Sequence, residues 1–519
     1  MRYLLCLSIL TAAAATPLAA QTATKLQPPS KAVTEAAGTI TAADVARRVG
    51  IIADDSMMGR DTPSPGLEQT AAYIAAQFKA FGLEPAGDEG GYLQRYPLIR
   101  RRLKVEDSYM QAAEVDGMGL VILPYATSAI HHVGALTGEP ITGSMVFLGG
   151  PPDPEKFPAD SVLKGKFLMW VMDWATVDQA ADGIMMKAMS AGMAGVIGIS
   201  NRDTAVVRRE AERAARVQVS RPSTEGQAYV IPPGVEVPEA AIVEQVPEAQ
   251  QTFDELRAAT VTTVFPFPEW EATVMAADTV LGPTSAPNVV AILEGSDPVL
   301  KHEYLVYSAH MDHIGISPGQ PDSINNGADD DASGTVGVIE LAEAFSRPGA
   351  RPKRSVIFLA VSGEEKGLWG SDYYTANPPV SLHQMVANIN LDMIGRNWPD
   401  TIVAIGPEHS DLGQTLAQVN TAHPELGMTV IDDPWPEENF FRRSDHFNFA
   451  RNGVPILFFF NGNHPDYHGV GDSPDKINAE KESRIVKLLF YVGQAVANAD
   501  ERPKWNPESY AKIVEPAEE

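Results

Sequence analysis

From Asn288 onward, short apolar runs alternate with segments whose apolar residues recur at helical spacing. The expected strands are 289–293, 304–308, 355–361, 386–391 and 454–460, and the expected helices are 336–345, 367–375 and 485–497. Such alternation favours a largely parallel sheet with helices on both faces. We therefore predict an α/β fold whose mixed, mostly parallel sheet is flanked by helices.

Ligand-type side chains follow four of these strands. They are His310 and Asp312 after the first, Glu364 and Glu365 after the second, Asp392 after the third, and His464 and His468 after the last, with a run of aspartates at 329–331. Open α/β sheets place their chemistry at strand ends. Imidazoles and carboxylates without thiols suit hard or borderline divalent ions. Their number is enough for two metal ions.

The chain has 519 residues, which is too long for one compact core and comfortable for two domains. Between about Val115 and Pro268 the pattern changes to strand-like runs such as 144–148 and 166–171, and ligand-type clusters are almost absent. We interpret this region as an inserted, mainly β domain with a helix or two, which limits access to the site or mediates contacts. The alternative is that it is part of one large catalytic domain.

The N-terminus has the pattern of a secretory signal. Arg2 precedes an apolar core at 4–15, and small residues at 17–20 resemble a cleavage site. The core is short for a membrane span, although a retained anchor is the alternative. The single cysteine, Cys6, lies in this segment. The mature chain would therefore lack disulfides, thiolate nucleophiles and cysteine-ligated metals, and we expect it in the periplasm or secreted.

The predicted organisation follows from these boundaries. It is a signal peptide at 1–20, the N-terminal part of a catalytic domain at 21–114, the insert at 115–268, the main catalytic domain at 269–505, and a tail at 506–519. Residues 21–38 have no apolar period and are expected to form a tail at the mature N-terminus. Amphipathic helices are expected at 41–48 and 67–81.

The formal net charge of −27 argues against nucleic acid or an anionic membrane as a partner. Most of the acidic side chains are expected to be solvated surface groups. The oligomeric state is not predicted.

Five motifs occur in one order: SAHMDH, NNGADDDASG, SGEEKGLWGS, NLDMIGR and DYHGVGDSPDKI. Together they resemble the zinc aminopeptidases of metallopeptidase family twenty-eight, in clan MH. The resemblance extends to DDSMMGR and to the helix ending in FGLEP, so it spans most of residues 41–500. Family members often carry a protease-associated domain before the first zinc ligand, and KGKFLMWV and AGMAGVIGI in the insert resemble pieces of one.

The resemblance implies two Zn²⁺ ions and a role for each site residue. One zinc would be held by His310 and Asp392, the other by Glu365 and His468, with Asp330 bridging both. Glu364 would be the general base for a metal-bound water, and Tyr467 would donate a hydrogen bond to the oxyanion. Asp312 would hold the His310 ring in the ligating tautomer, and Asp331 would support the ligands from behind. It also makes Asp330–Asp331 a candidate cis peptide. Co²⁺ or Mn²⁺ are possible substitutes for zinc.

Several alternatives remain at this stage. Asp329 competes with Asp330 as the bridge, and His464 competes with His468. His446 is a less favoured metal ligand, whereas His302 and His313 are interpreted as ordinary loop or surface histidines. A pocket for a large apolar side chain would include Phe440, Phe441 or Trp435, which are equally good core or lid residues.

The leading hypothesis is an aminopeptidase that releases N-terminal residues from peptides. The alternative is carboxypeptidase or dipeptidase action on the same metals, because ligands do not say which peptide terminus is held. Arg396, Arg442 and Arg443 are either carboxylate-binding residues or, as we favour, structural ion pairs. A metal-free receptor-like homologue, an aminoacylase relative and glutaminyl cyclisation are less favoured alternatives.

Overall fold

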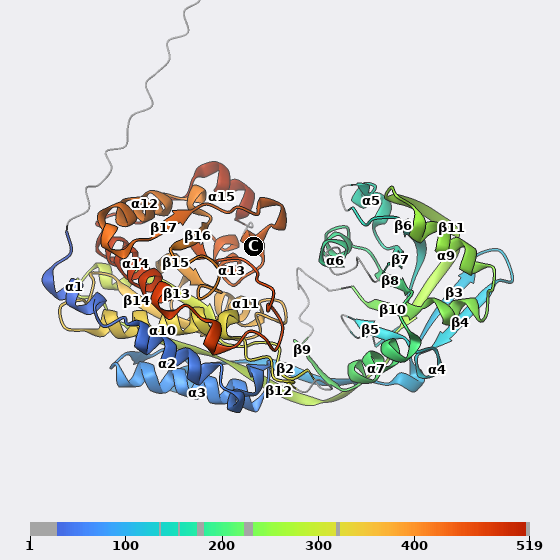
Figure 1. Cartoon of the computed structure of the whole chain (residues 1–519), viewed down its shortest axis with the longest axis horizontal. Coiled ribbons are helices and arrows are strands. Elements are labelled where there is room, and N and C mark those ends of the chain that lie inside the picture. Colours follow the sequence, from blue (N-terminus) through green and yellow to red (C-terminus); the bar gives the residue numbers. More distant parts are fainter. Residues whose placement is uncertain are drawn as a thin grey trace, which may run out of the picture.

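The computed structural model describes residues 28–133, 136, 138–153, 156–173, 181–222, 232–317 and 322–514. They form two bodies (Figure 1): a main body built from the N-terminal helices, β1, β2, the short strand β9 and the chain from β12 onward, and a second body built from the chain between β3 and β11 apart from β9. The predicted signal segment 1–20 lies outside the described residues.

The main body contains a ten-stranded mixed sheet with the order β17-β16-β18-β15-β13-β14-β12-β2-β9 and with β1 paired to β12. The strands are β1 (Glu84–Pro85), β2 (Leu93–Leu103), β9 (Val217–Ser220), β12 (Asp278–Leu293), β13 (Tyr304–His310), β14 (Ser355–Val361), β15 (Met385–Leu391), β16 (Thr401–Ile405), β17 (Thr429–Ile431) and β18 (Ile456–Phe459). The four neighbours β18, β15, β13 and β14 run parallel, while β12, β2 and β9 add antiparallel strands on one side.

The parallel centre explains why its strands are easy to find in the sequence. Every residue of β14 and β15 is buried, because helices cover both faces of the sheet. Strands of this kind are continuous apolar runs rather than alternating ones. The predicted mixed sheet flanked by helices is therefore confirmed, with parallel pairing among β18, β15, β13 and β14 and also between β16 and β17.

Helices pack on both faces of this sheet. One face is covered by α1 (Lys31–Ala37), α2 (Ala42–Ile52), α3 (Pro65–Ala80), α10 (Gly334–Ser346), α12 (Leu412–Ala422) and α14 (Ala479–Asn498), and the other by α11 (Trp369–Ala376) and α13 (His446–Arg451), with α15 (Pro507–Ile513) near the C-terminus. The Thr41 side chain accepts the Asp44 N–H at 3.1 Å and so begins α2, as expected from the sequence. Two predicted tails are partly wrong, because α1 and α15 are helices within them.

The second body has its own eight-stranded sheet, with the order β4-β3-β11-β6-β7-β8-β10-β5, and its own apolar cores. Its strands are β3 (Tyr109–Glu114), β4 (Leu120–Pro124), β5 (His131–Val133), β6 (Ile141–Gly149), β7 (Phe167–Met172), β8 (Gly195–Ser200), β10 (Gly234–Pro238) and β11 (Thr263–Met275), and its helices are α4 (Tyr125–Ser128), α5 (Asp160–Leu163), α6 (Ala181–Ser190), α7 (Thr204–Ala214), α8 (Glu239–Val243) and α9 (Ala249–Ala258). The described residues thus form more helices than the one or two expected.

The boundaries of the second body also differ from 115 and 268, because β3 and the end of β11 pair with each other outside that range. The connection to the main body runs through β2 and β12, which pair from Leu93 opposite Val289 to Leu103 opposite Asp278 (Figure 1). Among the residues that the structure describes, no helix has the length and apolarity needed to cross a membrane.

Candidate metal centre

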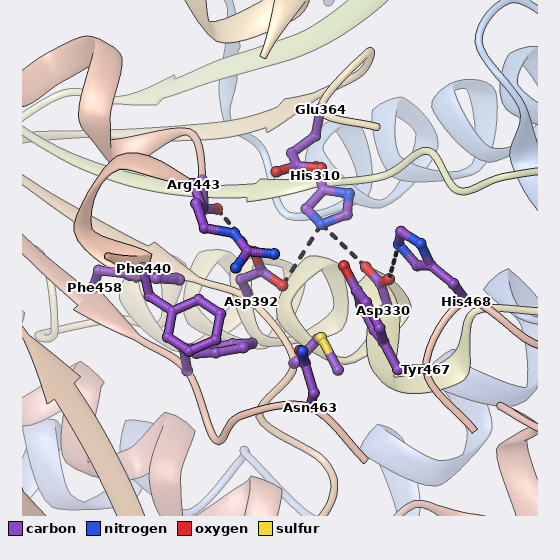
Figure 2. Close-up of a pocket in the computed structure, with 13 residues that line it drawn as sticks. His310, Asp330, Glu364, Asp392, Phe440, Arg443, Phe458, Asn463, Tyr467 and His468 are labelled. Atoms are coloured by element: carbon purple, nitrogen blue, oxygen red, sulfur yellow. Dashed lines mark hydrogen bonds and ion pairs between the residues drawn. The ribbon is translucent and has the colours of Figure 1, made fainter. Parts of the chain in front are cut away.

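The parallel register of the central strands brings the candidate ligands to one edge of the sheet. His310 is the last residue of β13 and lies opposite Val361, the last residue of β14, so that the segment holding Glu364 and Glu365 leaves the sheet beside it. Asp392 directly follows β15, which pairs with β13 on its other side. The loop after β18 carries Tyr467 and His468 to the same place (Figure 2).

Two clusters of nitrogen and oxygen atoms share Asp330. In the first, His310 Nε2 lies 3.4 Å from Asp330 Oδ1 and 3.6 Å from Asp392 Oδ1. In the second, His468 Nε2 lies 3.2 Å from Asp330 Oδ2 and 3.1 Å from Glu365 Oε2. Because its two oxygens face different histidines, Asp330 has the position of a bridging carboxylate (Figure 2).

The donor atoms fit divalent ions of the kind expected. Zinc bonds to nitrogen and oxygen are about 2.0–2.2 Å long, so neighbouring ligands in a tetrahedral site lie roughly 3.3 Å apart. The separations of 3.1–3.6 Å in the two clusters match that spacing. The structure thus brings all five residues of the predicted ligand set together in these two clusters.

The charges of the site also favour cations. Burial lowers the pKa of His310, but the Glu364 and Asp392 carboxylates raise it well above its ordinary value. For His468 the burial effect is likewise overcome, by Asp330 and Glu365, and the pKa rises to about 10. The carboxylates thus hold positive charge on both imidazoles, and a divalent ion would supply that charge in place of the protons.

His313 is a site residue that sequence reasoning missed. It was interpreted as a loop or surface histidine, but its side chain is fully buried, and its Nδ1 lies 2.8 Å from Glu365 Oε1 and 3.5 Å from Asp330 Oδ2. The interpretation was wrong because the loop after β13 folds inward. The available signal was the position of His313 directly after Asp312 in the ligand loop.

Asp331 and Asp312 lie behind the clusters. Asp331 accepts backbone N–H groups of His310 at 3.2 Å, Gly334 at 2.8 Å and Met393 at 3.1 Å, and so ties the loops together. His310 Nδ1 lies 3.3 Å from the backbone oxygen of Asp312 and 3.8 Å from its Oδ1. The closer partner of the ring is thus the carbonyl group of Asp312 rather than its carboxylate. The Asp330–Asp331 peptide is cis, as predicted.

The competing residues point elsewhere. Asp329 Oδ1 accepts the Gly395 N–H at 2.6 Å, and its Oδ2 lies 3.4 Å from His464 Nε2. These two side chains therefore pair with each other instead of joining the shared clusters. His446 Nε2 donates to the Phe441 oxygen at 2.8 Å, and burial lowers the pKa of His446 to about 3.

The clusters open into a pocket (Figure 2). Its lining includes Met393, Phe440, Phe458, Phe460, Arg443, Asn463, Glu364 and Tyr467. Of the aromatic residues proposed from the sequence, Phe440 lines the pocket, whereas Trp435 and Phe441 pack behind it against other rings. Burial raises the pKa of both Glu364 and Tyr467 well above their ordinary values.

The three arginines singled out in the sequence have different positions. Arg396 pairs with Asp466 at 2.9 Å, as a structural ion pair would. Arg442 lies over the ring of Phe447 at 5.2 Å. Arg443 pairs with Glu438 at 3.4 Å, as a structural ion pair would, and it also lies over the ring of Phe440 at 4.9 Å and lines the pocket.

Parts of the chain are similar to known proteins. Residues 288–493 match the model of Peptidase family M28. Leupeptin-inactivating enzyme 1 of Streptomyces exfoliatus is 30% identical over 176 residues, which cover 34% of this chain and 36% of that protein. A probable zinc metalloprotease of Pyricularia oryzae is 26% identical over 263 residues, covering 42% of this chain and 51% of the relative. The chain thus spans about half or less of the length of these curated relatives.

Two solved structures share the fold over most of the chain. An aminopeptidase from Aneurinibacillus sp. strain AM-1 has a TM-score of 0.52 and 18% identity, with 94% of this chain and 98% of that chain covered. A zinc aminopeptidase from Bacillus subtilis has a TM-score of 0.51 and 18% identity, with 92% and 98% covered.

Proposed function

We propose that this chain is a member of Peptidase family M28, whose model residues 288–493 match, and that it is a dizinc aminopeptidase that hydrolyses the N-terminal peptide bond of peptides. The observation that carries the proposal is the shared carboxylate of Asp330, whose oxygens lie 3.4 Å from His310 Nε2 and 3.2 Å from His468 Nε2. A bridging carboxylate is what two neighbouring dications require.

The five ligands divide into two sets. His310, Asp330 and Asp392 would hold one ion, and Asp330, Glu365 and His468 the other. We favour zinc because similar proteins are named as a zinc metalloprotease and a zinc aminopeptidase. Nitrogen and oxygen ligands of this kind also accept cobalt and manganese as substitutes. When bound, such ions lower the pKa of water and polarise a carbonyl group.

Two pocket residues carry the proton and the hydrogen bond. Glu364 takes the proton of the attacking water and passes it to the leaving amine. Tyr467 stays protonated because its pKa is raised, so its hydroxyl donates a hydrogen bond to the oxyanion that forms on the scissile carbonyl.

The names of the fold neighbours favour an aminopeptidase. The solved structures from Aneurinibacillus sp. strain AM-1 and from Bacillus subtilis are both those of aminopeptidases. Arg443 favours the second candidate, a carboxypeptidase or dipeptidase, because a guanidinium on the pocket wall suits a substrate carboxylate. Hydrolysis of an N-acetylated peptide but not of its C-amidated counterpart would favour the second candidate, and the reverse would favour the first.

We further propose that the protein acts in the periplasm or is secreted, and that the second body is a protease-associated domain. The apolar segment at 4–15 and the position of the second body before His310 support these two proposals. N-terminal sequencing of protein from the periplasm or medium tests the first, since an intact residue 1 would contradict signal removal.

The experiment that tests the function compares wild-type protein with Glu364→Gln. We expect two zinc equivalents in both and a loss of kcat of about 10²–10⁴-fold in the variant on a leucine-type chromogenic amide. Chelation should abolish wild-type activity, and zinc should restore it. A variant as active as wild type would exclude Glu364 as the base, and wild-type protein without metal or activity would favour the receptor-like reading.

A further inference from the structure

A short segment far from the ligand loops in the sequence reaches directly beneath them. It runs from Gly59 to Thr62, between α2 and α3, and lies outside the range that matches the peptidase family. Both Arg60 and Thr62 are fully buried. Buried polar side chains of this kind must find hydrogen-bond partners inside the protein, and here those partners belong to the candidate metal centre.

Arg60 joins two ligand loops through their backbone oxygens. Its Nε donates to Met311 at 2.9 Å, Nη1 to Asn326 at 2.6 Å, and Nη2 to Gly327 at 2.9 Å. Met311 lies between His310 and Asp312, and Gly327 lies three residues before Asp330. One rigid guanidinium therefore fixes the loop of the first histidine against the loop of the bridging carboxylate, which a point charge such as lysine would not do.

Thr62 joins the same region to the loop of the proposed base. Its hydroxyl accepts the Gly363 N–H at 3.1 Å and donates to Asp312 Oδ2 at 2.9 Å. The other oxygen of Asp312 accepts the Glu364 N–H at 3.3 Å. The hydroxyl therefore sets the orientation of the Asp312 carboxylate, and together they fix the backbone from which Glu364 and Glu365 project.

We propose that Arg60 and Thr62 are positioning residues of the metal centre, holding the loops of His310, Asp330 and Glu364 at the spacing that two ions require. The inference rests on the proposed function and extends the active centre to a segment outside the matched peptidase domain. Groups behind metal ligands typically change metal affinity or activity by about 10–100-fold when they are removed.

The test replaces Thr62 with valine, which keeps the shape and removes the hydroxyl, and with serine, which keeps the hydroxyl. Thr70→Val is the matched control, because Thr70 is equally buried and its hydroxyl donates to Gly66 within α3 at 3.1 Å, away from the ligand loops. Zinc affinity of the full chain is measured by chelator competition, alongside the visible spectrum of the cobalt-loaded protein and kcat and KM on a leucine-type amide.

We expect Thr62→Val to weaken zinc binding about 10–100-fold and to alter the visible spectrum of the cobalt-loaded protein. In this variant kcat should fall by a larger factor than KM changes. Thr62→Ser and Thr70→Val should stay close to wild type in all of these measurements. Wild-type zinc affinity and cobalt spectrum in Thr62→Val would overturn the inference. Equal losses in Thr62→Val and Thr70→Val, or no recovery in Thr62→Ser, would also overturn it. In these cases a wild-type protein that is active leaves the proposed function intact. A wild-type protein that binds neither zinc nor cobalt overturns both the inference and the proposed function.

Discussion

Removing the hydrogen bond between His313 and Glu365 should weaken one of the two metal sites. His313 Nδ1 lies 2.8 Å from Glu365 Oε1, while the other oxygen of that carboxylate faces His468 Nε2 at 3.1 Å. His313 thus contacts the oxygen of Glu365 that does not face His468. We interpret it as the residue that fixes the orientation of the Glu365 carboxylate.

The magnitude follows from the geometry. A hydrogen bond to a charged partner contributes about 1.5–3 kcal/mol. At about 1.4 kcal/mol per tenfold change, its loss corresponds to roughly 10–150-fold in zinc affinity at the site of Glu365 and His468. His313→Leu removes the donor at similar volume, and His313→Gln keeps a donor, so the loss should be larger in the leucine variant.

The assay is a zinc titration of metal-free protein in competition with a chelator, with bound metal counted at saturation. We expect two equivalents in every variant, one of them bound more weakly in His313→Leu. The exposed His302 provides the control, since His302→Gln should match wild type. Unchanged affinity of both sites in His313→Leu would refute the reasoning. A single bound zinc equivalent at saturation in His313→Leu would also refute the reasoning, because His313 would then be a direct metal ligand.

Three further predictions concern stability. Burial lowers the pKa of His446 to about 3, so the stability that the neutral ring gives to the folded state is fully present above pH 6.5 and is lost as pH falls toward 3. Between pH 7.5 and 5 this should lower the free energy of unfolding of the wild type by about 2 kcal/mol, a loss that His446→Gln should not show. Equal losses in both proteins would contradict this. Phe345, which packs on Tyr307, Phe358 and Phe490, should cost about 3–5 kcal/mol when replaced by alanine in urea unfolding, and a cost under about 1 kcal/mol would contradict that packing. Chelation should lower the temperature of the thermal unfolding transition, and zinc at about 1,000 times its Kd should restore about 4 kcal/mol of unfolding free energy. An unchanged transition temperature would exclude tight binding of zinc to the folded state.

The central strands and their ligands were predictable because each is a local pattern. The run at 356–361 is apolar throughout and is followed two residues later by Glu364 and Glu365, so strand and chemistry lie in one window of the sequence. The topological rule that parallel strands end at one edge then brings His310 and Asp392 together. That each of the five residues binds a metal ion is still a prediction, as are the signal peptide and the protease-associated assignment.

What the sequence could not show depends on distant partners. The helix at 31–37 is too short to be stable by its own propensity and forms because it packs on α10 and α14. β2 contains several arginines and pairs with β12, nearly two hundred residues later, so no local window identifies it. His313 belongs to the same class, since nothing in its neighbourhood indicates that Glu365 will lie against it.

The antiparallel pair of β2 and β12 also bears on the order in which the chain folds. Leu103 and Asp278 face each other in the ladder, although the whole second body lies between them in the sequence. In an unfolded chain, bringing these ends together carries an entropy penalty that grows with loop length, by about 0.6 kcal/mol per doubling. If the second body folds first, the pairing of β3 with β11 already holds its two ends side by side, and the effective loop shrinks to a few residues. The second body would then act as a folding template, and slowing its folding would delay formation of the metal centre even though it supplies none of the proposed ligands.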